Sequence, residues 1–293
     1  MSEDAVTYQS RDRIATITIN RAERMNRLDD AIVEGLHQAW RRFMASDADR
    51  VAILTGAGDK AFTAGADLKA LPTTLYRGIP GVGVPVDKPV VGAVAGWVVG
   101  GGMVLTTMCD ILIAADNARF SYPEVKVGFT GGIISALATR IPHKIAMELL
   151  LVGEAIDAQR AYEVGYVNKV VPPGELMPTA LDYARRIAAT APLPSRALKR
   201  FVAETLPKSP TELAGMARAQ VDAIFASEDW AEGQSAFAEK RPPAYRRSSG
   251  RRSTRWRTRS TITRGSTSAC PAARTRGGCS STATARWRRR SAR

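Results

Sequence analysis

Histidine and cysteine are scarce in this chain, which has two histidines and three cysteines among its 293 residues. The cysteines lack the spacing of zinc ligands and of a disulfide framework. His37 and His143 do not lie beside a glycine-flanked serine, so the sequence does not predict a Ser-His catalytic pair. We therefore expect a site without a metal or a redox cofactor.

Long apolar runs and nucleotide-binding motifs are missing as well. No stretch reaches the roughly 18 apolar residues of a membrane span, and the opening residues MSEDAVTYQS lack a signal-peptide pattern. Neither a G-x-G-x-x-G fingerprint nor a G-K-[ST] phosphate loop occurs. The sequence thus predicts a soluble cytoplasmic protein with no membrane partner, outside the dinucleotide-binding and P-loop classes.

Acidic residues and lysines are absent from residues 246–293, whereas 15 of the 42 basic residues, all arginines, lie there. Residues 1–245 carry 27 basic and 28 acidic residues, so they have no overall field that favours a polyanion. The tail has one isoleucine and no Leu, Val or Phe, too little apolar area to offset the entropy of ordering it. We predict that it is disordered. Its composition resembles an out-of-frame reading of GC-rich coding sequence; a nucleic-acid-binding arm and a solvated linker are the alternatives.

Strands and helices alternate along most of the remaining chain. Apolar or β-branched runs predict strands at 13–20, 51–55, 89–94, 110–114, 118–122 and 165–171. Helical periodicity predicts helices at 29–44, 104–109, 133–140, 144–152, 158–164, 176–190, 195–205 and 211–226. Asp29 or Asp30 can cap the first helix, and Asp157 can cap the fifth. This order predicts an α/β fold whose C-terminal third is helical.

Two turns rich in small residues follow apolar strands. The first is AGADL (64–68), and we expect a helix to begin near Asp67. The second is Gly100-Gly101-Gly102, where each glycine costs about 1 kcal/mol of helix stability. Both turns can present free backbone N–H groups to a ligand, although an ordinary turn or tight packing would also explain them. Two N–H groups that converge on one oxygen would form an oxyanion hole.

One carboxylate follows these turns. Proline fixes the chain just before Glu124, and Phe120, Val125 and Val127 nearby are apolar. Burial in such surroundings would raise the pKa of the carboxyl group and suit it to proton transfer. A solvated surface glutamate is the alternative for this residue taken alone.

Together these stretches resemble the enoyl-CoA hydratase/isomerase (crotonase) family over about residues 5–245. The segments that carry the resemblance are INRAERMNRLDD, KAFTAGADLKAL, AVAGWVVGGGMVLTTMCDILIAAD, ARFSYPEVKVG, GEAIDAQRAYEVGYVNKVVP and EGQSAFAEKRPPAY. The resemblance implies a spiral of ββα units at 1–190 and a helical region at 191–245 that packs homotrimers or dimers of trimers. The implied partner is an acyl-CoA thioester, with coenzyme A as part of the substrate, and no nucleic acid is expected on the body.

The resemblance also assigns roles to single residues. The N–H groups of Ala66 and Gly101 would hold the thioester oxygen, and Glu124 would be the acid/base. The residues matched to coenzyme A or acyl contacts are Arg24, Ala64, Asp67, Leu68, Lys69, Trp97, Gly100, Phe237 and Lys240. Solvated charges, and a core position for Trp97, are the alternatives. The Gly- and Pro-rich segment 71–87 is expected to shape the acyl pocket.

Val104 stands where the family's second catalytic glutamate would fall. Family hydratases hold a water molecule between two glutamates, whereas one carboxylate is enough to move a proton from C2 to C4 of a 3-enoyl thioester. The sequence therefore favours an enoyl-CoA isomerase, with an enoyl-CoA hydratase and other crotonase chemistry as alternatives. A catalytically silent acyl-CoA binder and a tail-driven nucleic-acid binder are the alternatives of another class.

Overall fold

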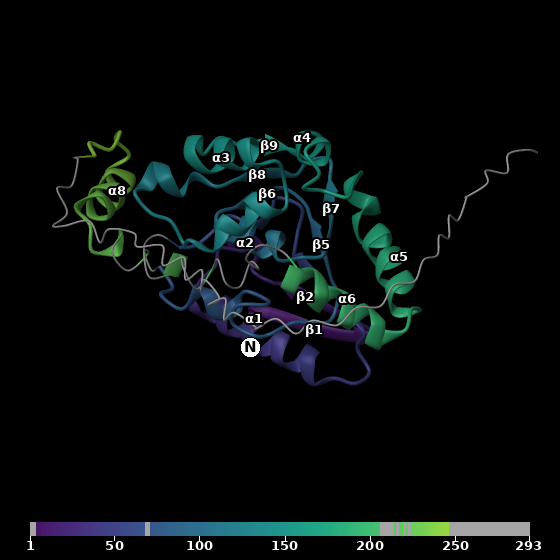
Figure 1. Ribbon diagram of the computed structural model, residues 1–293. Coiled ribbons are helices and arrows are strands. Elements are labelled where there is room, and N and C mark those ends of the chain that lie inside the picture. The colour runs from purple at the N-terminus through teal and green to yellow at the C-terminus, as the bar shows by residue number, and fades with distance from the viewer. Residues whose placement is uncertain are drawn as a thin grey trace, which may run out of the picture. The chain divides into compact units, whose positions relative to one another are not determined.

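Two β-sheets form the centre of the fold, shown in Figure 1. The computed structural model describes residues 4–67, 71–205, 214, 217–218, 221 and 224–245. In spatial order, the larger sheet contains β1 (Val6–Arg11), β2 (Ile14–Ile19), β3 (Val51–Gly56), β5 (Val90–Val94), β7 (Ile111–Ala115) and β10 (Lys169–Val171). The smaller sheet contains β4 (Ala61–Thr63), β6 (Trp97–Val99), β8 (Arg119–Ser121) and β9 (Ile156–Asp157).

Successive turns of the chain each add one strand to both sheets. The pairs β3/β4, β5/β6 and β7/β8 repeat this step, and their strands are parallel to the equivalent strands of the next turn. Only β1 and β9, at the ends of the sheets, pair antiparallel to their neighbours β2 and β8. This repetition is the spiral that the sequence predicts, and it stacks the ends of β6 and β8 side by side.

The first helix, α1 (Asp30–Ala45), forms as the sequence predicts. The Asp29 carboxylate accepts a hydrogen bond from the Ile32 N–H at 2.9 Å and thereby caps the helix start. The six apolar side chains of the expected stripe are all buried: Ile32, Val33, Leu36, Ala39, Trp40 and Phe43. Each of the larger ones stabilises the fold by about 1.5–3 kcal/mol through burial.

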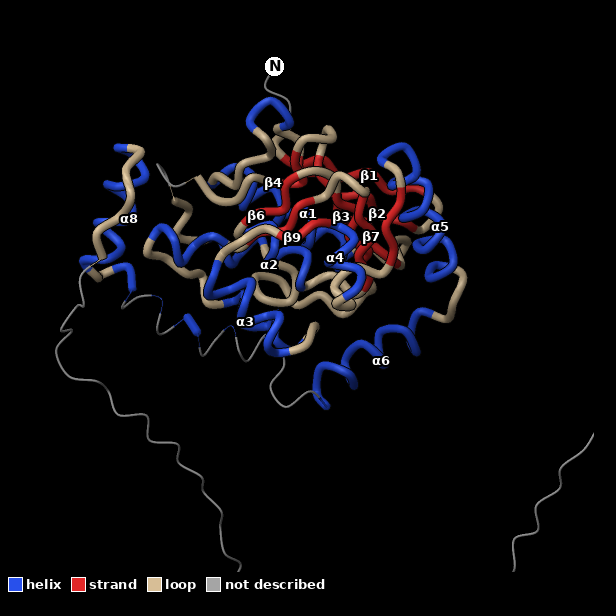
Figure 2. Tube along the Cα trace, turned by 90° about the horizontal axis from the view of Figure 1, so that it is seen from above, coloured by secondary structure: helices blue, strands red, loops and turns tan. Residues whose placement is uncertain are grey.

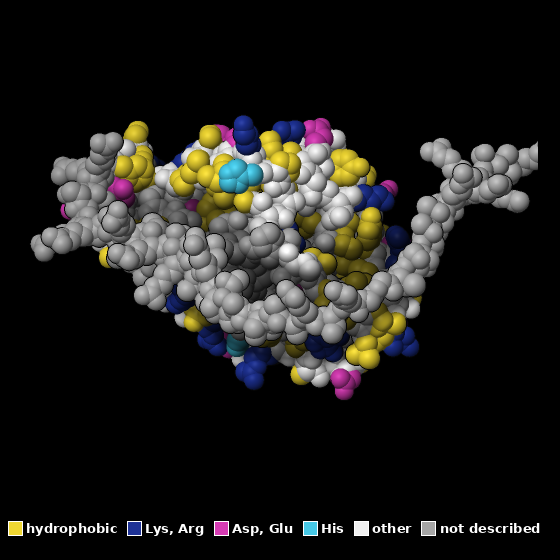
Figure 3. Space-filling view, viewed as in Figure 1, with side chains coloured by type: hydrophobic (Ala, Val, Ile, Leu, Met, Phe, Trp, Pro, Cys, Tyr) yellow, Lys and Arg dark blue, Asp and Glu magenta, His cyan; other side chains and the backbone are white. Residues whose placement is uncertain are grey.

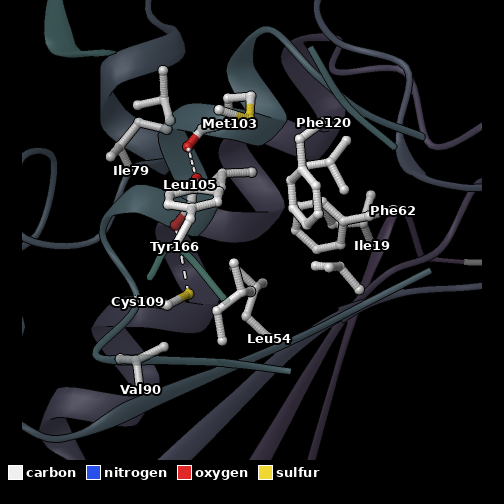
Figure 4. Packing of buried hydrophobic residues seen from close by; sticks show 14 of the residues in the cluster. Ile19, Leu54, Phe62, Ile79, Val90, Met103, Leu105, Cys109, Phe120 and Tyr166 are labelled. Atoms are coloured by element: carbon white, nitrogen blue, oxygen red, sulfur yellow. Dashed lines mark hydrogen bonds between the residues drawn. The ribbon is translucent and has the colours of Figure 1, made fainter. Parts of the chain in front are cut away.

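Large side chains from both sheets and from α2 (Gly101–Thr107) fill the space between the layers (Figure 4). Phe62 and Phe120 belong to the smaller sheet, and the Tyr166 hydroxyl donates to the Met103 carbonyl oxygen at 3.1 Å. Cys109 is also buried here, and burial raises the pKa of its thiol to about 12. The thiol is therefore protonated and inert, as expected from its apolar surroundings.

The other face of the larger sheet is covered by α5 (Leu176–Ala188), which Figure 2 shows beside the strands. Alanines at 180, 184 and 188 form its buried side, and small residues let a helix approach the sheet closely. Two more helices flank β9 of the smaller sheet in the chain: α3 (His143–Val152) precedes it and α4 (Ala158–Glu163) follows it. Asp157 caps α4 by accepting the Arg160 N–H at 2.8 Å, as predicted.

Several local predictions were wrong. Strand β1 was not predicted, because its residues are half-exposed and lack an apolar alternation. Residues 133–140 were predicted as an ordinary helix, but Ile133–Thr139 forms the 3-10 helix η4, in a stretch that follows two glycines. Only Lys169–Val171 of the predicted strand 165–171 is extended, after a glycine turn at Gly165.

The remaining elements lie toward the C-terminus and in connecting segments. Two helices, α6 (Pro192–Thr205) and α8 (Glu228–Glu239), follow α5. Four short 3-10 helices are η1 (Ala22–Arg24), η2 (Leu75–Gly78), η3 (Pro123–Val127) and η5 (Pro173–Glu175). None of the helices in the described ranges is long and apolar enough to cross a membrane. Most of the predicted helix 211–226, and the whole tail 246–293, lie outside the described residues.

Candidate active site

Glu124 lies where the chain leaves the smaller sheet. Strand β8 ends at Ser121, and Pro123 begins the 3-10 helix η3 that carries the glutamate. The residue is partly exposed as a whole, yet its Oε2 atom is buried and has no hydrogen-bond partner within the described part of the chain. Burial raises the pKa of the carboxyl group to about 8. Such a carboxyl group can lose and regain a proton near neutral pH.

Gly100 brings the start of α2 against this carboxylate. Its φ of 56° lies in the left-handed region, and its N–H donates to the Ser121 carbonyl oxygen at 3.0 Å. A methyl group added at Gly100 would overlap the Glu124 Oε1 atom. The glycine is therefore needed twice, for the backbone conformation and for the close approach of the carboxylate.

The Gly101 N–H is the first N–H group of α2, so it has no acceptor in an earlier helical turn. A methyl group at Gly101 would meet the side chains of Leu28 and Leu75. No backbone or side-chain acceptor for this N–H is found among the described residues. This N–H group thus lies next to Gly100 with no partner in the described chain, and its role as a donor to the thioester oxygen stays a prediction.

The Ala66 N–H belongs to an extended backbone segment that pairs with Leu28. The Leu28 N–H donates to the Gly65 carbonyl oxygen at 2.8 Å, and the Asp67 N–H donates to the Leu28 carbonyl oxygen at 3.1 Å. In this extended bridge the N–H of Ala66 points away from Leu28. The predicted helix start near Asp67 would fall on residues 68–70, which lie outside the described residues, so it stays a prediction.

The two predicted donors share a neighbour. Leu28 pairs with Ala66 through the backbone, and its side chain lies against Gly101. The Gly65 backbone, with a φ of 89°, also approaches the Val99 carbonyl oxygen at the end of β6. The parallel ends of β4 and β6 thus bring both backbone segments together near Glu124.

A cavity of about 320 Å³ lies beside α2, one helical turn after Gly100; Glu124 and the two predicted donors are not among its described lining residues. The Val104 N–H donates to the Gly100 carbonyl oxygen at 3.2 Å, and the Val104 side chain lines the cavity. Its walls are mostly apolar or aromatic and are formed by Leu71, Pro72, Thr73, Leu75, Tyr76, Ile79, Val82, Val104, Phe129, Gly131, Ile133, Ala214, Arg218, Val221 and Phe225. The segment 71–87 contributes seven of these residues, and its role in shaping an acyl pocket stays a prediction.

A larger cavity of about 590 Å³ lies against α6. Leu198, Lys199 and Val202 of the helix line it, together with Met108 and Ile111. Like the 320 Å³ cavity, it has none of the predicted site residues among its lining residues, but it also lacks Val104, which lines the smaller cavity. Size alone therefore does not make it the active site.

The residues matched to coenzyme A contacts fall into separate groups. The Ala64 N–H donates to the Met25 carbonyl oxygen at 2.9 Å. This hydrogen bond holds η1, which contains Arg24, beside the segment that contains Ala64 and Asp67. Arg24 itself is largely exposed, with 3.7 Å between its Nη1 and the Asp29 carboxylate. Leu68 and Lys69 lie outside the described residues.

The other three predicted contacts lie elsewhere. Trp97 is 42% exposed at the start of β6, so the core interpretation is wrong in a single chain. It does not line the 320 Å³ cavity, and its place beside the acyl group stays a prediction. Phe237 and Lys240 are exposed on and just after α8. Helix α8 packs on η3, since a methyl group added at Gly233 would overlap the Val127 carbonyl oxygen.

Two residues of the site were missed by the sequence analysis. The Tyr122 hydroxyl accepts the Gly131 N–H at 3.1 Å and lies 3.1 Å from the Thr130 hydroxyl, so it braces the loop after η3. Arg218 places its guanidinium 4.2 Å from the centre of the Tyr76 ring. Tyr122 directly precedes the Pro-Glu pair and could have been noticed, whereas no local pattern marks Arg218.

A model of the Enoyl-CoA hydratase/isomerase family matches residues 9–79 and 82–248. The chain belongs to this family.

The alignments with similar members of the enoyl-CoA hydratase/isomerase family span nearly the whole length of those proteins. An (E)-benzylidenesuccinyl-CoA hydratase of Thauera aromatica is 38% identical, over 82% of this chain and 98% of the relative. A crotonyl-CoA hydratase of Syntrophomonas wolfei is 34% identical, over 82% and 97%. The solved structure of a carnitinyl-CoA dehydratase from Mycobacterium avium has 35% identity and a TM-score of 0.76, over 84% of this chain and all of that one. The chain is thus a crotonase-fold enzyme, like enoyl-CoA hydratases, that acts on acyl-CoA thioesters.

Proposed function

We propose that this enzyme converts a 3-enoyl-CoA thioester into its 2-enoyl isomer, with Glu124 as the single acid/base. The observation that carries the proposal is Val104 beside the cavity, where the family resemblance would place a second glutamate. No acidic residue is among the described residues that line the cavity. The buried Glu124 carboxyl group, whose pKa is about 8, then acts alone.

The proposed reaction moves one proton and balances without a co-reactant. The Glu124 carboxylate removes a proton from C2, and the electrons of the C–H bond form a dienolate whose charge lies on the thioester oxygen. The resulting carboxylic acid returns the proton to C4, the C3=C4 bond opens, and a C2=C3 bond forms. No atom is gained or lost, so the step requires neither a metal ion nor a redox cofactor.

The proposed oxyanion donors are the N–H groups of Ala66 and Gly101. They stabilise the dienolate more than the neutral thioester because the oxygen gains charge only in the reaction. A single donor of this kind is typically worth about 10²–10³ in rate. The proposed coenzyme A contacts remain those of the family resemblance, with Arg24 and Lys240 as candidate partners of its phosphates.

Hydration of a 2-enoyl thioester is the second candidate, because the similar proteins from Thauera and Syntrophomonas are named hydratases. Water addition needs a group that holds the water as well as one that transfers the proton. With Val104 in the cavity wall, Glu124 would have to serve both purposes. We therefore expect hydration to be slower than isomerisation.

Self-association through α6 is also proposed. None of the side chains of this helix is buried in the single chain. Leu193, Leu198, Phe201 and Val202 are between 53% and 75% exposed, and hydrophobic side chains gather around α5 and α6 in Figure 3. Contiguous exposed apolar residues of this kind mark interfaces, which supports a homotrimer or a dimer of trimers.

Activity of the full chain with 3-hexenoyl-CoA and crotonyl-CoA, followed by ultraviolet absorbance and mass spectrometry, tests the proposal. We expect conversion of 3-hexenoyl-CoA to the 2-enoyl isomer without a mass change, and a loss of at least about 10²-fold in Glu124→Gln. Val104→Glu should raise hydration of crotonyl-CoA, while the matched Val104→Gln should not. Rapid hydration by the unaltered enzyme, with no isomerisation, would overturn the assignment.

A further inference from the structure

We propose that the 320 Å³ cavity binds an acyl group that carries a carboxylate, with Arg218 as the residue that recognises it. This inference rests on the proposed function because it places the acyl group of the thioester in this cavity. Arg218 is the one charged residue among the described residues of the lining. A cation at the edge of an otherwise apolar or aromatic cavity selects for an anionic group on the ligand.

The path from the reacting carbonyl to Arg218 follows neighbouring residues. Leu75 lies against Gly101, whose N–H is the proposed oxyanion donor, and it also lines the cavity. Val104, one turn later on α2, forms the next part of the wall. Tyr76 follows Leu75 in η2 and carries the Arg218 guanidinium at 4.2 Å from its ring centre. An acyl chain that begins at Gly101 therefore runs past Val104 toward Arg218.

The contacts of the Arg218 guanidinium leave it able to bind a carboxylate. The guanidinium carbon lies over the Tyr76 ring, 4.2 Å from its centre, and a guanidinium in contact with an aromatic ring can still form two hydrogen bonds to a carboxylate. No salt bridge of Arg218 to an acidic residue is found in the described part of the chain. By contrast, Arg77 nearby is paired with Glu34 at 3.1 Å.

The walls between these two ends strengthen the interaction. Ile79, Val82, Ile133 and Val221 are apolar, so few groups compete with the carboxylate for the guanidinium. Arg218 is exposed in the free protein, so the bound acyl group itself would displace water from the guanidinium, and this would strengthen the attraction between the opposite charges. A neutral acyl chain of the same length would forgo this interaction.

Binding of saturated analogues tests the proposal without catalysis. Titration calorimetry would compare adipoyl-CoA, which ends in a carboxylate, with hexanoyl-CoA for the full chain, Arg218→Met and Arg218→Lys. One charge-assisted pair corresponds to a preference of about 10- to 100-fold for adipoyl-CoA in the unaltered enzyme. Arg218→Met should remove this preference, and Arg218→Lys should retain part of it.

Arg185→Met is the matched control, because it removes one exposed positive charge from α5. It should bind both analogues as the unaltered enzyme does. Equal affinity for the two analogues in the unaltered enzyme, or an unchanged preference in Arg218→Met, would overturn the proposal. Kinetics with 3-hexenoyl-CoA and the mono-CoA thioester of 3-hexenedioic acid complete the test, and the preference should appear there mainly as a lower KM. Selective binding without turnover of either compound would refute the isomerase assignment alone.

Discussion

Glu124 depends on one neighbour that is distant in sequence, Gly100, and on two that are close, Tyr122 and Phe129. Gly100 leaves room for its Oε1 atom, while Tyr122 and Phe129 fix the loop on either side of it, the latter through an N–H that donates to the Glu124 carbonyl oxygen at 2.9 Å. The buried Oε2 atom has no partner in the described chain, so the charged form is disfavoured until a substrate arrives. The reactivity of the carboxylate therefore comes from its position rather than from its residue type.

The pH dependence of activity follows from this burial. The base must be ionised in the free enzyme, and the pKa of Glu124 is about 8. We expect kcat/KM for 3-hexenoyl-CoA to rise about tenfold per pH unit below pH 8 and to level off above it. Initial rates between pH 6 and 10 would show this, and a flat profile over that range would contradict the assignment.

Stability should change with pH in the opposite sense. Because the folded pKa lies above the unfolded value of about 4.3, this group stabilises the fold at acid pH, and the contribution is lost as pH rises toward and through 8. In thermal denaturation, Glu124→Gln should match the unaltered chain near pH 5 and exceed it near pH 9. The exposed Glu148→Gln serves as the control and should show no such difference.

At the scale of elements, the helix caps were predicted correctly, whereas strand β1, the helix type at 133–139 and the packing were not. Asp29 and Asp157 were predicted as caps because a cap involves residues only three positions apart. The oxyanion donors and Glu124 were assigned by resemblance, while the contact between Gly100 and Glu124 joins two turns of the spiral and leaves no local pattern. The contact between Arg218 and Tyr76 could not be predicted for the same reason, because the two residues lie far apart in the sequence.

Helix α6 shows how an element can be held in place without burying a side chain. Arg196 forms two hydrogen bonds to the Asp87 carboxylate, at 2.9 and 3.0 Å. Lys199 donates to Asp110 at 2.7 Å and to the Lys88 carbonyl oxygen at 2.9 Å. These polar contacts orient the helix so that its apolar residues remain available to a second copy of the chain.

Phe201→Glu should therefore reduce self-association. A charge at this exposed apolar position would have to be buried in the proposed interface, which is costly without a partner. Sedimentation velocity at micromolar concentration should show a shift from trimers or hexamers to smaller species. Gln159→Glu, which adds the same charge at an exposed position of α4, should leave the distribution unchanged. Identical distributions for Phe201→Glu and the unaltered chain would contradict a role for α6.

At the scale of the whole molecule, charge and chemistry are separated along the chain. The family match ends at residue 248, while all the arginines of the tail follow Tyr245. The residues assigned to the site lie within the near-neutral first 245 positions. The predicted disorder of the tail concerns residues outside the described ranges and stays a prediction.

A chain ending at Tyr245 should keep kcat/KM for 3-hexenoyl-CoA within about twofold of the full chain. The full chain should bind duplex DNA with an affinity that falls steeply as salt is raised, whereas the shortened chain should not, because phosphate binding depends on the arginines. Filter binding at 50 and 200 mM salt, beside the activity assay, would measure both. Loss of activity on shortening would show that the tail belongs to the enzyme.

The larger sheet adds its strands in the order in which the chain is made, from β1 to β10 without inserting a strand between earlier neighbours. On the ribosome, N-terminal residues emerge first, so each new strand of the larger sheet can pair with a neighbouring strand that has already been translated. Glu124 and its glycine are translated before α6 and α8. A shift of reading frame after codon 245 would therefore change only residues that are translated after the sheet and the carboxylate site. We expect the enzyme to keep its activity after such a mutation.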